Sequence, residues 1–295
     1  TMYNTAVGHQ AGGSVTTGTK NTLIGGLAGD ALTTGSENVS LGYGSLSADD
    51  LGSHSVAVGA SALASQNYAT ATDSFNTAVG SFAGYAITTG VQNTLMGRGA
   101  GDALTDADYN VAIGYNALSA DTLGSTSTAI GLSALSVQNF TTATNSFNTA
   151  VGYTAGGSVT TGQYNTIVGG LAGDAITTGN RNVALGTSAM STNVLGSRST
   201  ALGTNALLAQ NPATAVDMYN TGVGYSAGTA VTTGIYNTFV GGLTGEALTS
   251  SDANSAFGYA ALGSDTLGNQ NSAIGYKTLQ NQNFTTATDV YNTAV

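Results

Sequence analysis

A five-residue motif recurs along the whole chain at a fixed interval, and this period constrains the fold more than any other feature. Asn4-Thr5-Ala6-Val7-Gly8 returns with small changes at residues 21, 38, 55 and 76, in three steps of 17 residues and one of 21. The steps then restart, which divides the chain into four 72-residue repeats, 4–75, 76–147, 148–219 and 220–291. Such self-similarity is typical of a protein built from one stacked structural element.

Seventeen residues are too few for a pair of helices, but they fit one coil of a β-solenoid with two short strands joined by turns. One coil cannot bury its own apolar face, so coils must stack about 4.8 Å apart, each strand pairing with the strands above and below it. We therefore predict an all-β fold, a parallel β-solenoid or β-roll, running as a single continuous domain over residues 1–295. The pattern is cut at both ends, so we expect a segment of a longer fibre.

The motif also predicts a role for each of its residues. Thr5 and Val7 lie two apart and therefore on one face of a strand, and their counterparts are β-branched or aliphatic, so this pair is expected to face the core. Gly8 permits backbone angles that a Cβ would block. The repeated Asn predicts a hydrogen-bonded ladder from coil to coil, and a simple turn preference of Asn is the competing interpretation. The ladder positions are Asn4, Asn21, Asn38, Asn76, Asn93, Asn110, Asn148, Asn165, Asn182, Asn220, Asn237 and Asn254.

Composition narrows the classes of partner. Only 7% of the residues are charged, and five Lys and Arg stand against fifteen Asp and Glu. Nucleic acid is not expected, because phosphate contacts need a basic footprint. A membrane span within this segment is not expected either, since no run approaches the roughly 18 consecutive apolar residues that a span requires.

The motif resembles a known family. Asn-Thr-Ala-Val-Gly, recurring along a chain rich in Gly, Ser, Thr and Asn and free of Cys, is similar to the head repeats of trimeric autotransporter adhesins (YadA-like heads) and to related repeats of bacteriophage tail fibres. The closest single match is Ser55-Val56-Ala57-Val58-Gly59. The resemblance covers the whole chain, although the coil is longer here and the 72-residue period is not part of the family pattern. It implies a left-handed parallel β-roll, often three chains side by side, that attaches to a surface.

Enzymatic chemistry is not expected. A catalytic site needs a unique constellation, and equivalent positions of the repeat show none: His9, for example, is replaced by Ser81, Tyr153 and Tyr225. With two His, no Cys and no singular pair of acids, the sequence predicts neither an enzyme nor a transition-metal cofactor.

One set of acids does recur, at a single position of the second coil of each repeat. Oxygen-rich turns can bind Ca²⁺, so these acids are the calcium candidates. The equivalents lie four coils apart and the calcium-roll nonapeptide is absent, so solvated charge that keeps molecules apart is the favoured interpretation. The four residues are Asp30, Asp102, Asp174 and Glu246.

Tyrosines gather directly after the Gly of the motif. A row of Tyr side chains offers an apolar body with a polar tip, which suits lateral contact with a partner chain or stacking on sugars; covering the turn edges is the structural alternative. The lateral-contact candidates are Tyr43, Tyr115, Tyr153, Tyr225, Tyr259 and Tyr276.

The sequence thus predicts a non-enzymatic, extracellular structural fibre or adhesin segment, at a cell or virion surface. It is expected to assemble with copies of itself, as a homotrimer or a helical filament, and to space or mediate attachment to a host surface or glycans. A bacteriophage tail-fibre shaft is one alternative, and a calcium- or glycan-binding repeat module is another. The longer fourth coil, with its Gln-Asn segment at Gln66, Gln138, Gln210 and Gln282, is the feature that sets the repeat apart from a plain stack.

Overall fold

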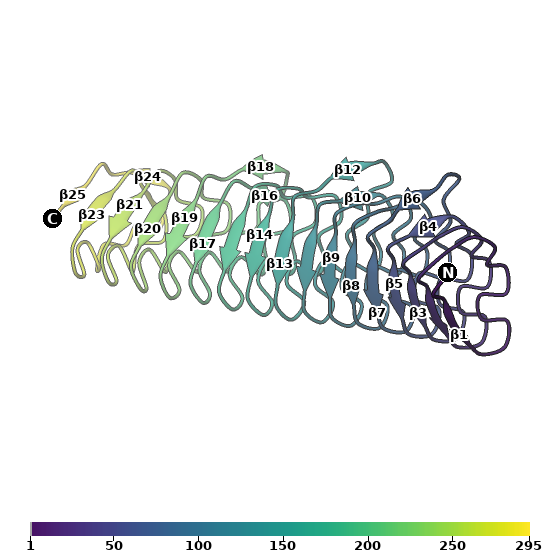
Figure 1. Cartoon of the computed structure of the whole chain (residues 1–295). Helices are drawn as coiled ribbons and strands as arrows, with labels where there is room; N and C mark the ends of the chain where they lie inside the picture. Colours follow the sequence, from purple (N-terminus) through teal and green to yellow (C-terminus); the bar gives the residue numbers. More distant parts are fainter. Residues whose placement is uncertain (1) are drawn as a thin grey trace. The chain divides into compact units, whose positions relative to one another are not determined.

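The computed structural model describes residues 2–295 and divides into two compact units, Thr1–Phe147 and Asn148–Val295. Each unit is a stack of coils that contains two of the 72-residue repeats (Figure 1). Secondary structure over the described residues consists of strands and turns, without helix. The predicted all-β solenoid is confirmed within each unit.

In the first unit, eight three-residue strands form a parallel ladder, one strand from each coil. They are β1 (Thr5–Val7), β2 (Thr22–Ile24), β3 (Val39–Leu41), β5 (Val56–Val58), β7 (Thr77–Val79), β8 (Thr94–Met96), β9 (Val111–Ile113) and β11 (Thr128–Ile130). Each pairs with its counterpart one coil further along, as in Thr5 with Thr22 and Thr22 with Val39. The register therefore follows the sequence period directly.

The second unit repeats this ladder with nine strands. They are β13 (Thr149–Val151), β14 (Thr166–Val168), β15 (Val183–Leu185), β17 (Thr200–Leu202), β19 (Thr221–Val223), β20 (Thr238–Val240), β21 (Ser255–Phe257), β23 (Ser272–Ile274) and β25 (Thr293–Ala294). Pairing is again parallel, with Leu185 opposite Leu202.

Among residues 2–295, the predicted second strand is present in the third and fourth coils of each 72-residue repeat and is missing from the first and second coils. A second strand of two residues forms only where the third coil of a 72-residue repeat meets the longer fourth coil, because the four extra residues bring a further segment alongside. These pairs are β4 (Gly52–Ser53) with β6 (Thr72–Asp73), β10 (Gly124–Ser125) with β12 (Thr144–Asn145), β16 (Gly196–Ser197) with β18 (Val216–Asp217), and β22 (Gly268–Asn269) with β24 (Thr288–Asp289). Elsewhere the coil is closed by turns. The longer segments, 67–75, 139–147, 211–219 and 283–291, are called ledges below.

The core lies inside each coil, and the positions that line it differ between the coils of a repeat. Counting the repeated Asn as position 1, the inward apolar side chains of the first and second coils are at positions 3, 8 and 12, as in the buried cluster of Leu23, Ala28 and Leu32. Position 8 is Ala in most coils, because the coil is too narrow for a larger side chain there. In the first and second coils of a repeat, apolar side chains from positions 3 and 12 fill the rest. In the third and fourth coils position 12 is polar, and a Leu or Met at position 9, such as Leu46, Leu63 or Met190, fills the core instead.

The predicted core face of the strand is therefore wrong. Leu23, the middle residue of β2, is fully buried, whereas Thr22 and Ile24 on either side of it point outward and are half-buried. The same pattern holds along both ladders, so Thr5 and Val7 and their counterparts lie on the outer surface. The reason is the Asn: its side chain at position 1 points inward, and a period of two then sends position 3 inward and positions 2 and 4 outward.

The Asn ladder is confirmed at all twelve predicted positions. In the first unit, the Asn4 Oδ1 accepts a hydrogen bond from the Asn21 backbone N–H at 2.8 Å, and the Asn4 Nδ2 donates to the Gly18 carbonyl, 14 residues further along, at 2.8 Å. In the second unit Asn165 bonds Asn182 and Gly179 in the same way, at 3.0 and 2.9 Å. Each Asn side chain thus hydrogen-bonds across its own coil and to the backbone of the next coil. The other ten are Asn21, Asn38, Asn76, Asn93, Asn110, Asn148, Asn182, Asn220, Asn237 and Asn254.

Candidate functional site

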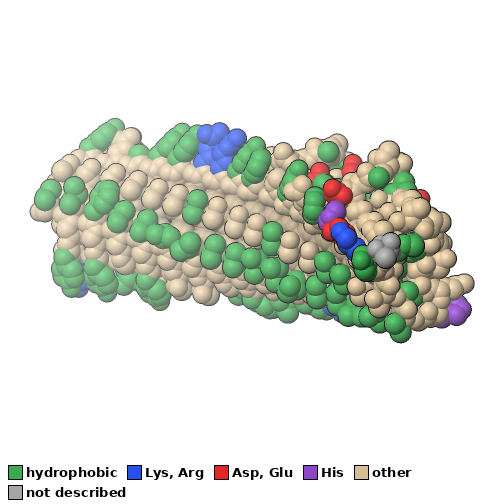
Figure 2. All heavy atoms as spheres, in the orientation of Figure 1, with side chains coloured by type: hydrophobic (Ala, Val, Ile, Leu, Met, Phe, Trp, Pro, Cys, Tyr) green, Lys and Arg blue, Asp and Glu red, His purple; other side chains and the backbone are tan. Residues whose placement is uncertain are grey.

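The candidate site is the outward surface of the strand ladder, called the outer face below and made of the side chains at positions 2 and 4. Position 2 holds Thr, Val or Ser, and position 4 holds Val, Ile, Leu, Met or Phe in every coil. Because each strand pairs in register with the next, like positions form continuous rows about 4.8 Å apart within a unit. Figure 2 shows hydrophobic side chains in rows that run from coil to coil.

This surface is uncharged over the full height of each unit, and its position-4 row is apolar beside a position-2 row that is mostly Thr. At position 4, Leu41, Met96, Leu202, Phe257 and Ile274 all remain exposed after folding. Soluble monomers seldom expose a contiguous apolar patch of more than a few hundred Å², and a larger patch marks a site of association. The outer face is therefore the candidate surface for association.

Two rows border the outer face, one at position 6 and one directly before the next Asn. The second is position 17, and the equivalent residue of the longer fourth coil, such as Tyr219, is counted with it. Tyr219 and Tyr236 stack at position 17 with ring centroids 5.6 Å apart and planes 9° apart, and Tyr259 and Tyr276 stack at position 6 at 5.7 Å and 15°. Stacked rings turn their faces toward the next coil and their edges toward the surface. These pairs therefore offer a partner phenol edges and hydroxyl groups, not the open ring faces on which a sugar would stack.

All six Tyr candidates for lateral contact lie in the position-6 border row and are exposed. The structure places them beside the outer face, so the same partner could touch both. Tyr115 is covered in part by the Arg98 guanidinium, 5.6 Å from its ring centroid. The six are Tyr43, Tyr115, Tyr153, Tyr225, Tyr259 and Tyr276.

A buried polar cluster, which the sequence did not predict, joins the third coil to the fourth. The Gln66 Nε2 donates to the Asp49 Oδ2 at 2.7 Å and to the Ser55 Oγ at 2.8 Å, and the Gln66 Oε1 accepts from the Asn76 Nδ2 at 2.9 Å. In this coil, position 1 is occupied by Ser55, which has no side-chain amide. The side-chain amide of Gln66 therefore continues the hydrogen-bonded ladder across the coil. The Gln-Asn segment was the available signal in the sequence, and its Gln is structural.

The cluster recurs with one natural substitution. Gln138 bonds Asp121, and Gln282 bonds Asp265, each at 2.6 Å. In the third repeat Asn193 replaces the acid and turns its own side chain onto Gly196, and the Gln210 Nε2 has no hydrogen-bond partner. An unsatisfied buried donor costs about 1–3 kcal/mol, so the Gln210 side chain stabilises this coil less than Gln66 and Gln138 stabilise theirs.

Burial raises the pKa of the Asp49 and Asp121 carboxyls above the ordinary value of 3.8, and the hydrogen bonds from Gln66 and Gln138 offset the shift only in part. The folded protein then binds these protons at a pH where the unfolded chain has released them. Stability therefore increases as the pH falls from neutral through the raised pKa values, and the gain is complete near the unfolded value. Burial shifts the pKa of Asp102 and Asp174 in the same direction.

We expect the free energy of unfolding, measured by urea denaturation, to rise between about pH 7 and about pH 4.5. The double variant Asp49→Asn, Asp121→Asn removes two of the titrating groups and should show a smaller slope, whatever its absolute stability. An equal slope in the variant and the parent would show that these carboxyls do not contribute.

The acids that were the calcium candidates do not converge. Asp30, Asp102 and Asp174 each leave one carboxylate oxygen buried without a partner, and Asp30 lines a pocket of 290 Å³ with Gln10, Gly13 and Ser14. Among residues 2–295 no group of three or more His, Cys, Asp or Glu could hold a metal ion. Glu246 occupies the equivalent position in the fourth repeat. The geometry supplies one carboxylate per site, whereas Ca²⁺ takes six to eight oxygen ligands.

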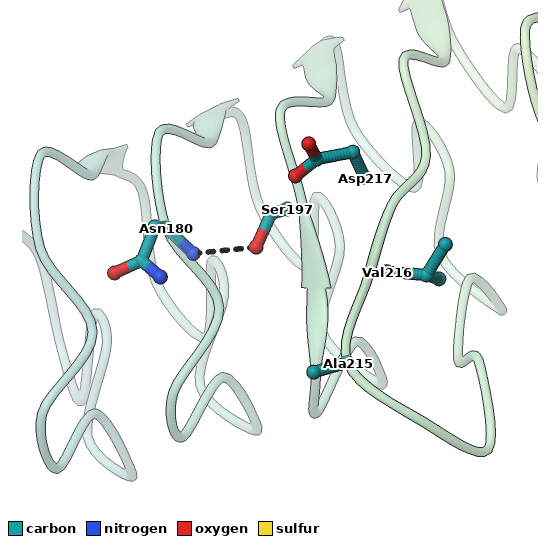
Figure 3. A pocket seen from close by; sticks show the side chains of 5 residues that line it. All are labelled: Asn180, Ser197, Ala215, Val216 and Asp217. Carbon is teal, nitrogen blue, oxygen red and sulfur yellow. Dashed lines mark hydrogen bonds between the residues drawn. The ribbon is translucent and has the colours of Figure 1, made fainter.

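A second pocket, of 480 Å³, lies under the third ledge (Figure 3). Asn180 and Ser197 form one side, where the Asn180 backbone N–H donates to the Ser197 Oγ at 3.0 Å, and Ala215, Val216 and Asp217 form the other. The Asp217 carboxylate pairs with the Arg198 Nε at 3.0 Å. This open, polar pocket contains no nucleophile with an adjacent base, and its one acid is already engaged.

Searches of the chain against models of protein families, curated proteins and solved structures return no match. No helix among the described residues is long and apolar enough to cross a membrane. The assignment of a role therefore depends on the geometry of the outer face.

Proposed function

We propose that this chain is a structural segment of an extracellular fibre or adhesin, a stiff β-solenoid that associates laterally with copies of itself and spaces or mediates surface attachment. The observation that carries the proposal is the outer face. Both outward positions of every strand are uncharged, and one of them is aliphatic or aromatic throughout. A chain with so few charged residues still orders its apolar side chains into one continuous surface in each unit, which is the arrangement that lateral association needs.

The area of the face with its border rows is compatible with a stable contact. Within the first unit, eight strands at about 4.8 Å spacing, with a width of at most about 20 Å that includes both border rows, make at most roughly 700 Å². Two such faces in contact bury at most roughly 1,400 Å², which lies within the range of stable protein interfaces. A second copy of this chain is the partner that presents a matching surface.

The related alternatives have less support. A bacteriophage tail-fibre shaft would use the same solenoid and the same association, and differs in the assembly to which it belongs. Against a calcium-binding module, the candidate acids do not converge on a shared site. Against a glycan-binding module, the stacked Tyr pairs present ring edges and not the open ring faces on which a sugar would stack.

We expect the purified chain to associate at micromolar concentration, and charges placed on the outer face to prevent it. Leu185 and Leu202 pair across β15 and β17 and are 40% and 39% exposed, so the double variant Leu185→Lys, Leu202→Lys should keep the fold and weaken association by at least about 100-fold. Sedimentation velocity measures the change.

The matched control is Val137→Lys, Val216→Lys. These residues are 43% and 37% exposed and lie off the outer face, at position 11 and on a ledge. The control adds the same charge to side chains of similar exposure and should associate like the parent chain. A parent chain that remains monomeric up to about 100 µM, a concentration at which even a modest interface would be occupied, would refute the proposed self-association.

A further inference from the structure

Charge is sorted between the sides of the coil. All five Lys and Arg of the chain lie beside the outer face: Lys20, Arg181 and Arg198 at position 17, Arg98 at position 6 and Lys277 at position 7. Of the fifteen acids, only Glu37 lies in these rows. The others lie between positions 10 and 16 or on the ledges, and those that are not buried in the polar cluster give these sides of the coil their negative charge.

The cations of the border rows are locally occupied and so do not make a basic patch. Lys20 pairs with Glu37 at 2.7 Å, and Arg198 pairs with Asp217. Arg98, Arg181 and Lys277 lie over the rings of Tyr115, Tyr164 and Tyr276, at 5.6, 5.1 and 5.4 Å. The outer face itself is thus uncharged, whereas the other sides of the coil carry fourteen of the fifteen acids and none of the five cations.

This asymmetry decides which symmetry an assembly can use. Three outer faces that point to a three-fold axis touch one another only along their edges. In an open filament, neighbours meet through two different surfaces, so an outer face would have to pack against an acid-bearing side. That contact leaves apolar area facing carboxylates and brings net negative sides together. A two-fold contact uses the same surface on both molecules, so it buries both outer faces and leaves every acid-bearing side in water.

We infer that the assembly is a closed pair, two copies joined outer face to outer face about a two-fold axis, in which the acid-bearing sides oppose the addition of a third copy. This inference rests on the proposed self-association, and it replaces the trimer implied by the family resemblance with a dimer. Like charge on the remaining surface is what limits growth, so the limit should weaken when salt screens that charge.

The mass of the assembly in solution distinguishes a closed pair from a trimer, a growing filament and a monomer. Light scattering of the full chain should give twice 29.0 kDa, without growth as concentration rises at about 0.1 M salt, and the Leu185→Lys, Leu202→Lys variant should give the monomer mass. A trimer mass, or a mass that grows with concentration, would overturn the closed pair and leave the proposed function standing. A monomeric parent chain would overturn both.

A labelling experiment tests the geometry itself, and the absence of native Cys makes it direct. Single cysteines are introduced as Leu202→Cys on the outer face, and as Val137→Cys and Val216→Cys on the acid-bearing sides. In a closed pair, the rate of reaction with a thiol reagent falls with protein concentration for Leu202→Cys alone, by at least about tenfold when nearly all of the protein is paired. A matching fall at Val137→Cys or Val216→Cys would show a contact between unlike surfaces and refute the two-fold pair.

Discussion

Two adjacent glycines should respond in opposite ways to the same substitution. Gly169 follows strand β14 with φ of +133°, and a Cβ there would lie 2.6 Å from the Gly186 carbonyl oxygen of the next coil. Gly169→Ala therefore combines a backbone conformation that L-residues avoid with a clash against backbone, and we expect a loss of about 3–5 kcal/mol in the free energy of unfolding. The melting temperature should fall by roughly 10 °C, measured by circular dichroism.

Gly170→Ala is the matched control, one residue further along. A Cβ at Gly170 would meet nothing within 4 Å, and its φ does not lie in the region that favours glycine. The substitution should be neutral or stabilise by up to about 1 kcal/mol, because Ala restricts the unfolded chain. Similar losses from both substitutions would show that Gly169 acts through flexibility and not through the close approach of neighbouring coils.

The second large effect is expected at the Asn ladder. Asn93 is fully buried; its Oδ1 accepts from the Asn110 backbone N–H at 3.0 Å, and its Nδ2 donates to the Ala107 carbonyl at 2.8 Å. Asn93→Ala leaves both backbone groups buried without this partner and opens a small cavity. At about 1–3 kcal/mol for each unsatisfied group, the loss should be about 3–5 kcal/mol, measured by urea denaturation.

The exposed Asn67, at the start of the first ledge, provides the control: Asn67→Ala should change stability by less than about 0.5 kcal/mol. The variant Asn93→Asp separates the two interpretations of the repeated Asn. It keeps the acceptor and the turn preference but loses the Nδ2 donor and buries a charge. If the Asn93→Asp variant proved as stable as the parent chain, the turn preference alone would account for the residue.

Much of the architecture could be predicted from the sequence because the period is a property of the chain itself. Strands recurring every 17 residues can pair in register only in a parallel stack, and the Asn at each corner meets its counterpart one coil away. The Gly at position 5 likewise follows from the stack, since neighbouring coils approach each other most closely there. These features depend on local spacing and on contacts between identical positions.

The strand face was predicted wrongly, although the sequence contains a signal for it. In most strands both outward residues are β-branched or aliphatic, which is typical of a core face, and the middle residue is often only Ala. The small interior of the coil rules out that interpretation, because one Ala side chain fits there and two Val side chains would not. Alternate residues of a strand point to the same side, so an Asn that points inward at position 1 requires position 3 to point inward as well. The ladder prediction and the core-face prediction were therefore inconsistent with each other.

The buried polar cluster could not be predicted in the same way. Asp49, Gln66 and Asn76 come from three different coils, and only the turn of the solenoid brings their side chains together. The αL backbone of Tyr109 and Phe75 at position 17 is likewise imposed by the stack, since bulky residues do not favour positive φ on their own.

The sequence by itself determined the repeat, the coil length, the parallel stacking and the role of the Asn, because each depends on spacing along the chain. Only the tertiary structure decided which side chains face water, and with them the outer face, the sorting of charge around it and the polar cluster under the ledges. Direction in or out of a coil depends on where the chain turns and how much volume the turn encloses, and both are set by packing between coils.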